Sequence, residues 1–383
     1  MRHLIALAGV LLLVPNQQYL ARPIQPVVKG LLEPLRGHLP PFRTRPLYLP
    51  DFGESQQLSL SPDGRSVLVK ASYPRLYWAY TPSYLAIADT ATGAFHSLTL
   101  GLFVDVGGAC WAQTSDAVLF RSDHYEGPAR SDLQDLSRDA SEGGPLWKLN
   151  VRTGDLYPIR TPAPPPPFEG IRVSLGGVVL SPGGDQFLMP ATHEVRHAGA
   201  QASHTSVIYR GGWGAEHLEY LGEGCMPTWS PDGRYIAFQR LVTHPEDEAS
   251  SYPRLIWEHW VMRADGTERR RLLGYEQLKP LVERFGAWAV RAENAVWLPR
   301  GQGILTILRD THPKAVECEL CTHTGFWIVD MKTGQSIVVL DEEQVRRIYP
   351  SRDGTHWLVE TADRWEGLEH QVKFNYYLLD FEG

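Results

Sequence analysis

The sequence predicts an all-β chain that forms a six-bladed β-propeller of four-stranded antiparallel blades. Two observations support this prediction: a ten-residue pattern that recurs six times, and a second turn pattern that comes after each of the first five copies. The clearest copy is WSPDGRYIAF, residues 229–238. The other five copies begin at residues 60, 111, 180, 297 and 350. Internal repetition at this scale is typical of repeat arrays and propellers.

Each copy has the chemistry of a strand, a tight turn and a second strand. In the clearest copy, Pro231 presets φ for the first turn position, and Asp232 can bond its own backbone two residues on. Gly233 accepts the positive φ that closes the turn. The next residues, 235–238, are mostly apolar, as in a buried strand. We therefore expect a hairpin of strands A and B in every repeat.

The second pattern also indicates two strands joined by a turn. It is clearest in YLAIADTATGAFHSLTL (84–100), LWKLNVRTGDLYPIR (146–160) and FWIVDMKTGQSIVVL (326–340), with looser versions at 206–221 and 260–273. Thr-Gly or Asp-Gly stands at the bend of each of these segments except 206–221. These segments supply strands C and D, so each repeat of roughly 58 residues gives four strands.

The last repeat lacks an outer strand, because only one further strand, 375–381, comes after its hairpin. An unpaired edge would be left open unless another segment covers it. The segment RPLYL, residues 45–49, precedes the first repeat and is the obvious donor. Pairing of this segment with the last blade would join the two ends of the chain and close the ring.

The SPDGR hairpin followed by a D-x-x-T-G turn resembles the propeller of TolB-type, WD-repeat-like proteins and that of dipeptidyl-peptidase-like enzymes. The resemblance covers about residues 45–383 and implies a scaffolding, binding or gating role. Two departures limit it. The segment before the repeats is shorter than the N-terminal domain of TolB. We also find no hydrolase domain after the repeats and no G-x-S-x-G elbow, so peptidase activity is not expected.

Composition favours one closed domain, since 43% of the 383 residues are hydrophobic and no linker separates two halves. The formal charge of −7 argues against nucleic-acid binding, which requires a basic face. It is compatible with small ligands or protein partners.

The N-terminus has the pattern of a secretory signal. Met1-Arg2-His3 precedes an apolar run over residues 4–14, and we expect a signal peptide over residues 1–21. Tyr19 is not small, which disfavours cleavage after Ala21 and leaves an uncleaved membrane anchor as an alternative, with a buried helix as another. Residues 22–44 are Pro-rich and predict an irregular tether. The expected location is periplasmic or extracellular, with membrane attachment through an uncleaved N-terminus.

The connections between strands B and C are expected to be long, at 71–83, 121–145, 190–204, 241–258, 309–324 and 361–374, whereas the other turns within blades are short. In a propeller these connections all emerge on one face, and loops on a rigid scaffold carry function disproportionately. Aromatic and His residues gather in them, as at ligand and protein contacts. The candidate binding residues are Tyr77, Trp78, His124, Tyr125, His244, Tyr252, Trp365 and His370.

A literal H-E-x-x-H stands at residues 193–197. On a helix, His193 and His197 would share a face for zinc, with Glu194 as general base and His204 as a further ligand. The short expected loop between Pro190 and Gly199 leaves little room for such a helix. We keep a metal site of these His residues, and ordinary loop residues, as alternatives to metalloprotease chemistry.

The cysteines offer a second candidate site. Cys318 and Cys321 form C-x-x-C beside His323, and this set can hold zinc, form a local disulfide or remain as free thiols. Cys110 and Cys225 fall on the first strands of non-neighbouring blades, so we expect them to be buried thiols without a mutual bridge.

The sequence thus predicts an exported, non-catalytic propeller that binds a protein or peptide of the cell envelope through its B–C loop face. No cofactor is required, although a zinc ion is compatible with the His and Cys candidates. The alternative is a metal-dependent hydrolase or lyase with its site on the same face. The inner-strand positions carry Trp111, Trp229 and Trp297 rather than converging acids and His, which favours binding.

Overall fold

In the computed structural model, all of the described strands belong to one compact unit, residues 32–383. The structure describes residues 32, 35, 37–47, 49, 57–72, 83–99, 106–122, 146–159, 171–195, 203–243, 255–285, 289–293, 295–311, 324–341, 345–363 and 373–382.

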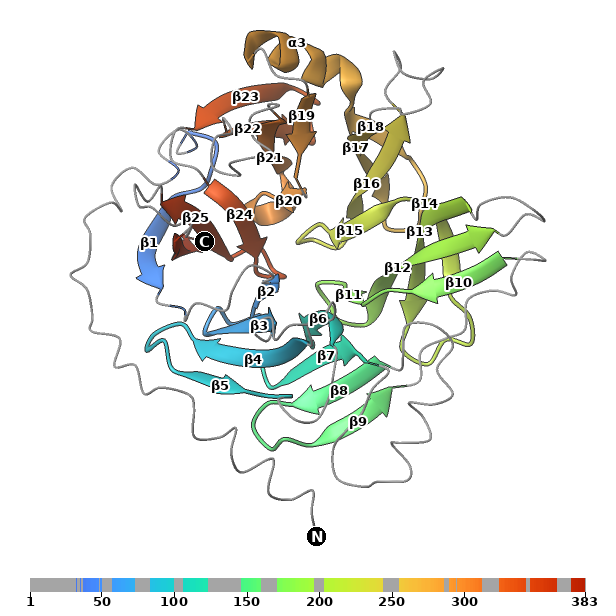
Figure 1. Cartoon of the computed structure of the whole chain (residues 1–383), viewed down its shortest axis with the longest axis vertical. Coiled ribbons are helices and arrows are strands. Elements are labelled where there is room, and N and C mark those ends of the chain that lie inside the picture. Colours follow the sequence, from blue (N-terminus) through green and yellow to red (C-terminus); the bar gives the residue numbers. More distant parts are fainter. Residues whose placement is uncertain are drawn as a thin grey trace, which may run out of the picture. The chain divides into compact units, whose positions relative to one another are not determined.

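Six antiparallel sheets are arranged around a central axis as the blades of a propeller, which confirms the predicted fold (Figure 1). Blade 1 contains β2 (Gln57–Leu60), β3 (Ser66–Ser72), β4 (Ser83–Asp89) and β5 (Phe95–Ser97). Blade 2 contains β6 (Gly107–Trp111), β7 (Ala117–Arg121), β8 (Leu146–Asn150) and β9 (Leu156–Ile159). Blade 3 contains β10 (Ile171–Leu175), β11 (Val179–Leu180), β12 (Gln186–Val195), β13 (Ser203–Gly212) and β14 (Glu219–Glu223).

The other three blades have the same order from the axis outward. Blade 4 contains β15 (Cys225–Trp229), β16 (Tyr235–Thr243), β17 (Leu255–Arg263) and β18 (Arg270–Leu273). Blade 5 contains β19 (Ala289–Ala292), β20 (Val296–Trp297), β21 (Gly303–Thr311), β22 (Thr324–Asp330) and β23 (Ser336–Asp341). Blade 6 contains β24 (Val345–Pro350), β25 (His356–Asp363), β26 (Lys373–Phe381) and β1 (Phe42–Leu47).

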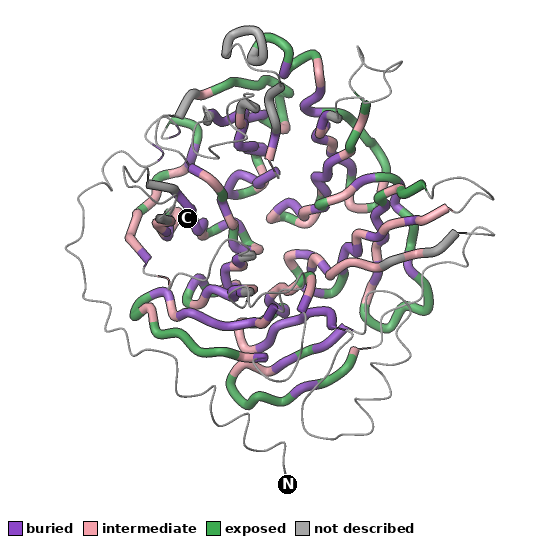
Figure 2. The backbone as a smooth tube through the Cα atoms, in the orientation of Figure 1, coloured by how far each residue is buried: buried purple, intermediate pink, exposed green. Residues whose placement is uncertain are grey.

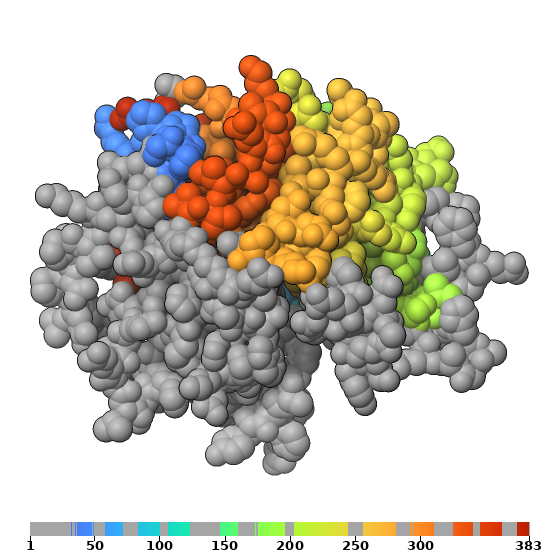
Figure 3. All heavy atoms as spheres, turned by 90° about the horizontal axis from the view of Figure 1, so that it is seen from above, coloured from blue at the N-terminus to red at the C-terminus, as the bar shows by residue number. Residues whose placement is uncertain are grey.

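The ring closes because β1, from the start of the described chain, pairs antiparallel with β26, its last strand. The pairing runs from Phe42 opposite Phe381 to Leu47 opposite Tyr376, so the donor strand begins three residues earlier than the expected 45–49. In Figure 3 the blue atoms of this segment lie beside red atoms of the C-terminus. The Arg45 guanidinium also donates to the Thr90 carbonyl of blade 1, at 2.6 Å.

The A–B turns form as their residues require. In blade 4 the Ser230 hydroxyl donates to Asp232 Oδ1 at 2.6 Å, and the same oxygen accepts from the Arg234 amide at 3.0 Å. Gly233 has φ of 71°. The equivalent turns of blades 1 and 6 repeat the Ser-to-Asp hydrogen bond at 2.7 Å.

The core consists of apolar layers between neighbouring blades, seen as buried stretches along the inner strands in Figure 2. Three Trp residues at the ends of inner strands join adjacent blades. The Nε1 of Trp111 donates to the Ser59 carbonyl at 2.9 Å, and that of Trp229 to the Val179 carbonyl at 3.0 Å. Trp297 makes the corresponding bond to the carbonyl of Thr228 at 3.3 Å.

Two features were not predicted. The inner strands of blades 3 and 5 are each split into two pieces, and α3 (Tyr275–Phe285) comes after β18. Leu278 of this helix is buried against blades 4 and 5. None of the helices in the described part of the chain is both long and apolar enough to span a bilayer.

Candidate functional site

The two ends of the ring differ, and the contacts among the A–B turns define them. An added Cβ on Gly354 would lie 2.9 Å from Pro231 of blade 4, and one on Gly184 would lie 2.7 Å from Gln113 of blade 2. The Asp63 amide of blade 1 donates to the Ser115 hydroxyl of blade 2. The A–B turns therefore gather at one end, which we call the turn end. The opposite end, where strands B stop and strands C begin, is the loop end.

The predicted binding residues fall in the B–C connections. Their flanking strands end at the loop end, as expected for a propeller. The residues themselves lie outside the described part of the chain: Tyr77, Trp78, His124, Tyr125, His244, Tyr252, Trp365 and His370.

The H-E-x-x-H segment begins on a β-strand, which corrects the expectation that His193 lies in a loop. The strands β12 and β13 are ten residues long each and take up most of the expected connection 190–204. His193 is opposite Thr205, whereas His204 is opposite Glu194. Because neighbouring residues of a strand face opposite sides, His193 and His204 lie on opposite faces of the sheet.

His193 is 8% exposed, and its Nε2 lies 2.7 Å from the Tyr209 hydroxyl. Its ring stacks against Tyr220, and burial lowers its pKa. Within the described ranges no group of three His, Cys, Asp or Glu residues is placed to hold a metal ion. His197, Cys318, Cys321 and His323 lie outside those ranges, so the metal and disulfide alternatives stay predictions.

A cavity of about 440 Å³ lies on the axis of the ring, within the size range of ligand pockets. All six blades contribute to its wall through their inner strands. One representative from each blade is Leu58, Cys110, Val179, Thr228, Val296 and Tyr349.

Arg352 lies at the turn end of this cavity and links two blades that are not neighbours. Its Nη2 donates to the carbonyls of Trp111, at 2.5 Å, and Ala112, at 2.8 Å, both in blade 2. Burial lowers the pKa of Arg352. Burial also raises the pKa of the Cys110 thiol to about 12, against the opposing effect of Arg352, so Cys110 is a neutral thiol at pH 7.

Nearer the loop end, buried polar side chains hold the inner strands of the next blades along the chain. Arg121 Nε donates to the Gly176 carbonyl at 2.6 Å, at the break between β10 and β11. Gln239 donates to the Glu293 carbonyl at 3.1 Å, at the break between β19 and β20, and lies 2.9 Å from His259 Nε2. Burial lowers the pKa of Arg121 to about 10 and that of His259 to about 4.

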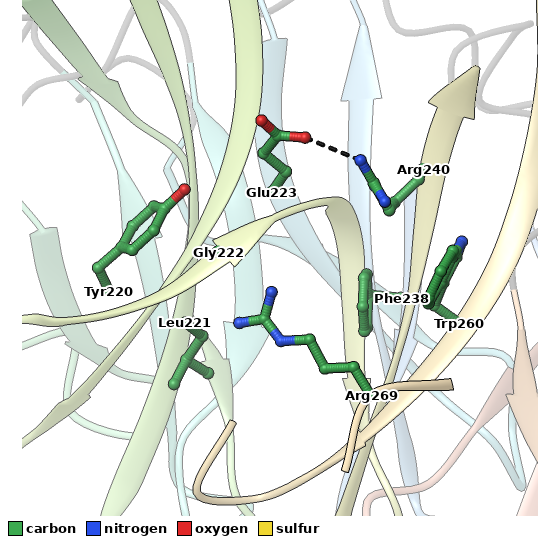
Figure 4. A pocket seen from close by; sticks show the side chains of 8 residues that line it. All are labelled: Tyr220, Leu221, Gly222, Glu223, Phe238, Arg240, Trp260 and Arg269. Carbon is green, nitrogen blue, oxygen red and sulfur yellow. Dashed lines mark hydrogen bonds and ion pairs between the residues drawn. The ribbon is translucent and has the colours of Figure 1, made fainter. Parts of the chain in front are cut away.

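A second cavity of about 330 Å³ lies between the outer strand of blade 3 and blade 4 (Figure 4). Arg240 donates to Glu223 at 2.8 Å and lies 5.3 Å from the centre of the Trp260 ring. Gly222 has φ of 120°, and its missing side chain leaves room for the Arg269 guanidinium. Arg240 is paired with Glu223, and the Nε of Arg269 donates to the Gly266 carbonyl at 3.2 Å. We therefore interpret this cavity as a contact between blades.

Three solved structures illustrate what this chain is similar to. The chain resembles TolB from Acinetobacter baumannii with a TM-score of 0.42 and 13% identity, over 74% of this chain and 54% of that one. It thus spans about half the length of that TolB chain. An oligogalacturonate lyase in complex with manganese gives a TM-score of 0.48 and 12% identity, over 90% and 97% of the two chains.

The β-propeller domain of the Trilobed protease from Pyrococcus furiosus gives a TM-score of 0.42 and 13% identity, over 84% of each chain. The six blades of this chain confirm the propeller fold by themselves, and likenesses this distant transfer no activity. No protein-family model and no curated protein matches this sequence.

Proposed function

We propose that this chain is an exported, non-catalytic propeller that binds a protein or peptide of the cell envelope through its loop end. The observation that carries the proposal is the asymmetry of the ring. The A–B turns contact one another at the turn end, so every B–C connection leaves from the loop end. Elaborated connections on one end of a rigid scaffold favour recognition there.

The content of those connections supports protein recognition. Aromatic residues are enriched in protein interfaces because they supply large contact area at little cost in side-chain entropy. Tyr77 and Trp78 in blade 1, Tyr125 in blade 2 and Trp365 in blade 6 are of this kind. A partner that spans several blades would contact them together.

The scaffold beneath the loop end is well fixed. The buried hydrogen bonds of Arg121 and Gln239 attach each inner-strand break to the preceding blade. Buried and satisfied polar contacts of this kind hold one geometry. The strand ends that carry the B–C connections therefore have defined positions.

The proposal is tested by variants of the two ends in the tagged full chain. Partners would be cross-linked in the native cells and quantified by mass spectrometry. We expect the yield of the principal cross-linked partner to fall by at least 90%, which is roughly tenfold, in the triple variant Tyr77→Ala/Trp78→Ala/Trp365→Ala. The turn-end variant Arg65→Ala/Arg234→Ala should retain it. Retention by the first variant, or loss from the second, would contradict the proposal.

A measurement of metal content distinguishes this proposal from the alternative, a metal-dependent hydrolase or lyase. The protein would be purified without a His tag, alongside the variant His193→Ala/His197→Ala. We expect no stoichiometric metal in either. One equivalent of zinc that is lost in the variant would instead favour the enzyme.

A further inference from the structure

The outer strand of blade 5, β23, forms an exposed apolar edge of its sheet. Its sequence is SIVVLD, and the order of the described strands in this sheet ends with it (Figure 1). Ile337 and Val338 are 37% and 39% exposed, and Figure 2 shows this part of the ring as exposed. An edge strand presents a row of backbone N–H and C=O groups, so an exposed apolar edge is a template for pairing with another strand.

The outer strands of the other five blades carry features that disfavour such pairing. β5 has only three residues, and β9 contains a proline. β14 begins and ends with a glutamate, and its pairing with β13 contains a register shift. β18 begins with two arginines, and β1 contains two arginines and a proline. Short strands, proline, charges and bulges all block edge pairing. The apolar run of β23, residues 337–340, has none of these features.

The hydrogen bonds at the start of β23 show which of its backbone groups point outward. The Asp330 amide donates to the Gln335 carbonyl at 2.9 Å, which makes these two residues a hydrogen-bonded pair. The pairing of β22 with β23 continues from there without a register shift. Because hydrogen-bonded and non-hydrogen-bonded pairs alternate along antiparallel strands, the odd-numbered residues of β23 bond to β22. The backbone groups of Ser336, Val338 and Leu340 therefore point away from β22.

We propose that β23 pairs antiparallel with β23 of a second copy of this chain, across a two-fold axis at Val338. In this register the outward backbone groups of Val338 bond those of Val338 in the other copy, and those of Ser336 bond those of Leu340. Ile337 is then opposite Val339 of the other copy, so apolar residues face each other. The same surface serves both copies, as a two-fold interface requires. This self-association uses the outer edge of the ring and goes beyond the recognition proposed for the loop end.

The charges at the two ends of β23 favour an antiparallel second copy as the occupant. Asp341 ends the strand, whereas the turn that precedes the strand carries the exposed Lys332. In the two-fold register Asp341 is opposite Gln335 of the other copy, next to the turn with Lys332. A parallel pairing in register would instead set Asp341 opposite Asp341, and like charges directly opposite each other are destabilising. The two ends of the edge are therefore complementary in the antiparallel order.

The association is expected to be weak, because only three residues of each copy supply outward backbone groups. Interfaces smaller than about 1,000 Å² are typical of weak or transient complexes. We therefore expect a dissociation constant on the order of 100 µM. The dimer then dissociates at the low protein concentrations that are used for unfolding measurements.

The first test is sedimentation equilibrium of the full-length protein over concentrations that bracket about 100 µM. We expect a monomer at the low end and a dimer at the high end. Val338→Lys sets two lysines opposite each other across the axis and should raise the dissociation constant at least about tenfold. Tyr157→Lys, at a 54% exposed position of the outer strand β9, is the matched control and should leave it unchanged.

A dimer that persists in Val338→Lys would overturn the proposal, because it would use another surface. A protein that stays monomeric throughout would also overturn it. Slow hydrogen exchange of β23 in that monomer would then show that another segment of this chain covers the edge.

The second test concerns the register. Val338→Glu should weaken the dimer as Val338→Lys does, because two like charges again meet at the axis. An equimolar mixture of the two variants places a lysine opposite a glutamate, and we expect it to dimerise at least about tenfold more tightly than either variant alone. Misfolding of a variant cannot produce this recovery. A mixture that associates no better than its components would contradict the pairing of Val338 with Val338 across the axis.

Discussion

The indole nitrogens of the inner-strand Trp residues join blades through backbone carbonyls, and this role is specific to the N–H group. Trp111 and Trp357 are both fully buried, at 2% and 0% exposure. Trp111 Nε1 donates to the Ser59 carbonyl, whereas Trp357 Nε1 has no partner within the described residues. The same substitution at the two positions therefore separates the hydrogen bond from the packing of the ring.

We predict that Trp111→Phe lowers the free energy of unfolding by about 1–2 kcal/mol more than Trp357→Phe. The first change leaves the Ser59 carbonyl without its donor, while the second removes a donor that is already unsatisfied. Urea unfolding of both variants measures the difference. Equal losses would show that the indole N–H of Trp111 contributes nothing to the contact between blades.

A buried histidine makes stability depend on pH. Burial lowers the pKa of His259 to about 4, and its ring lies between Gln239 and Thr306. The unfolded chain, with a His pKa of about 6.5, binds the proton first as the pH falls. The stability that the buried, neutral His259 contributes is therefore fully present above about pH 6.5. It is lost as the pH falls from about 6.5 to about 4.

Between pH 7 and pH 5, His259 should cost the unmodified protein about 2 kcal/mol of unfolding free energy. We predict that the variant His259→Gln does not show this loss, because glutamine does not titrate. Urea unfolding at the two pH values measures this. His217→Gln, at an exposed position, is the control and should behave as the unmodified protein does. A pH dependence unchanged in His259→Gln would contradict the assignment.

At the scale of elements, the contact between blades 2 and 3 depends on two glycines. A Cβ on Gly177 would lie 2.3 Å from the Gly108 Cα, a backbone atom that cannot move aside as a side chain would. A Cβ on Gly212, in the same blade, would meet its nearest atom at 3.8 Å. We predict that Gly177→Ala lowers the free energy of unfolding by about 2 kcal/mol or more, and Gly212→Ala by less than about 1 kcal/mol. Thermal and urea unfolding measure both, and a neutral Gly177→Ala would contradict this packing.

The hairpins could be predicted from sequence because their turns are local. Pro231, Asp232 and Gly233 favour a turn through their own local chemistry, and exact or looser copies of this pattern recur in the other blades. The breaks at Gly176 and Glu293 could not be predicted, because they depend on Arg121 and Gln239 of the preceding blades. The helix α3 was missed because it contains Pro280, which disfavours a helix interior. Its Leu278 is buried against blades 4 and 5, a contact that sequence alone does not show.

The candidate site was predictable only in part. The sequence could predict that the B–C connections lie at one end of the ring, because this placement depends only on the order of the strands. The position of His193 was missed, because β12 continues past Pro190 to Val195 through pairing with β10 and β13. The axial cavity with Arg352 was also missed. Arg352 occupies the position that proline holds in other turns, and this substitution in the repeat was the one signal that could have indicated it.

At the scale of the molecule, closure of the ring depends on a strand from the N-terminal side. Leu47 of β1 is 5% exposed and packs with Leu58 of blade 1 and Leu378 of blade 6. We predict that Leu47→Ala lowers the free energy of unfolding by about 2–4 kcal/mol, because it leaves a cavity where the first and last blades meet. Ile337→Ala, in the exposed outer strand of blade 5, should cost less than about 1 kcal/mol. A Leu47→Ala variant as stable as Ile337→Ala would show that β1 does not close the ring.

The most direct test of loop-end recognition is site-specific photo-cross-linking of the full chain in its native cells. A photoreactive phenylalanine analogue would replace one residue at a time: Trp78 or Trp365 in the B–C connections, and Arg65 or Arg234 in the A–B turns. We predict one discrete cross-linked partner from both B–C positions and none of it from the turn positions. Cross-links to that partner from Arg65 or Arg234, with none from Trp78 and Trp365, would contradict the proposal that the loop end binds it.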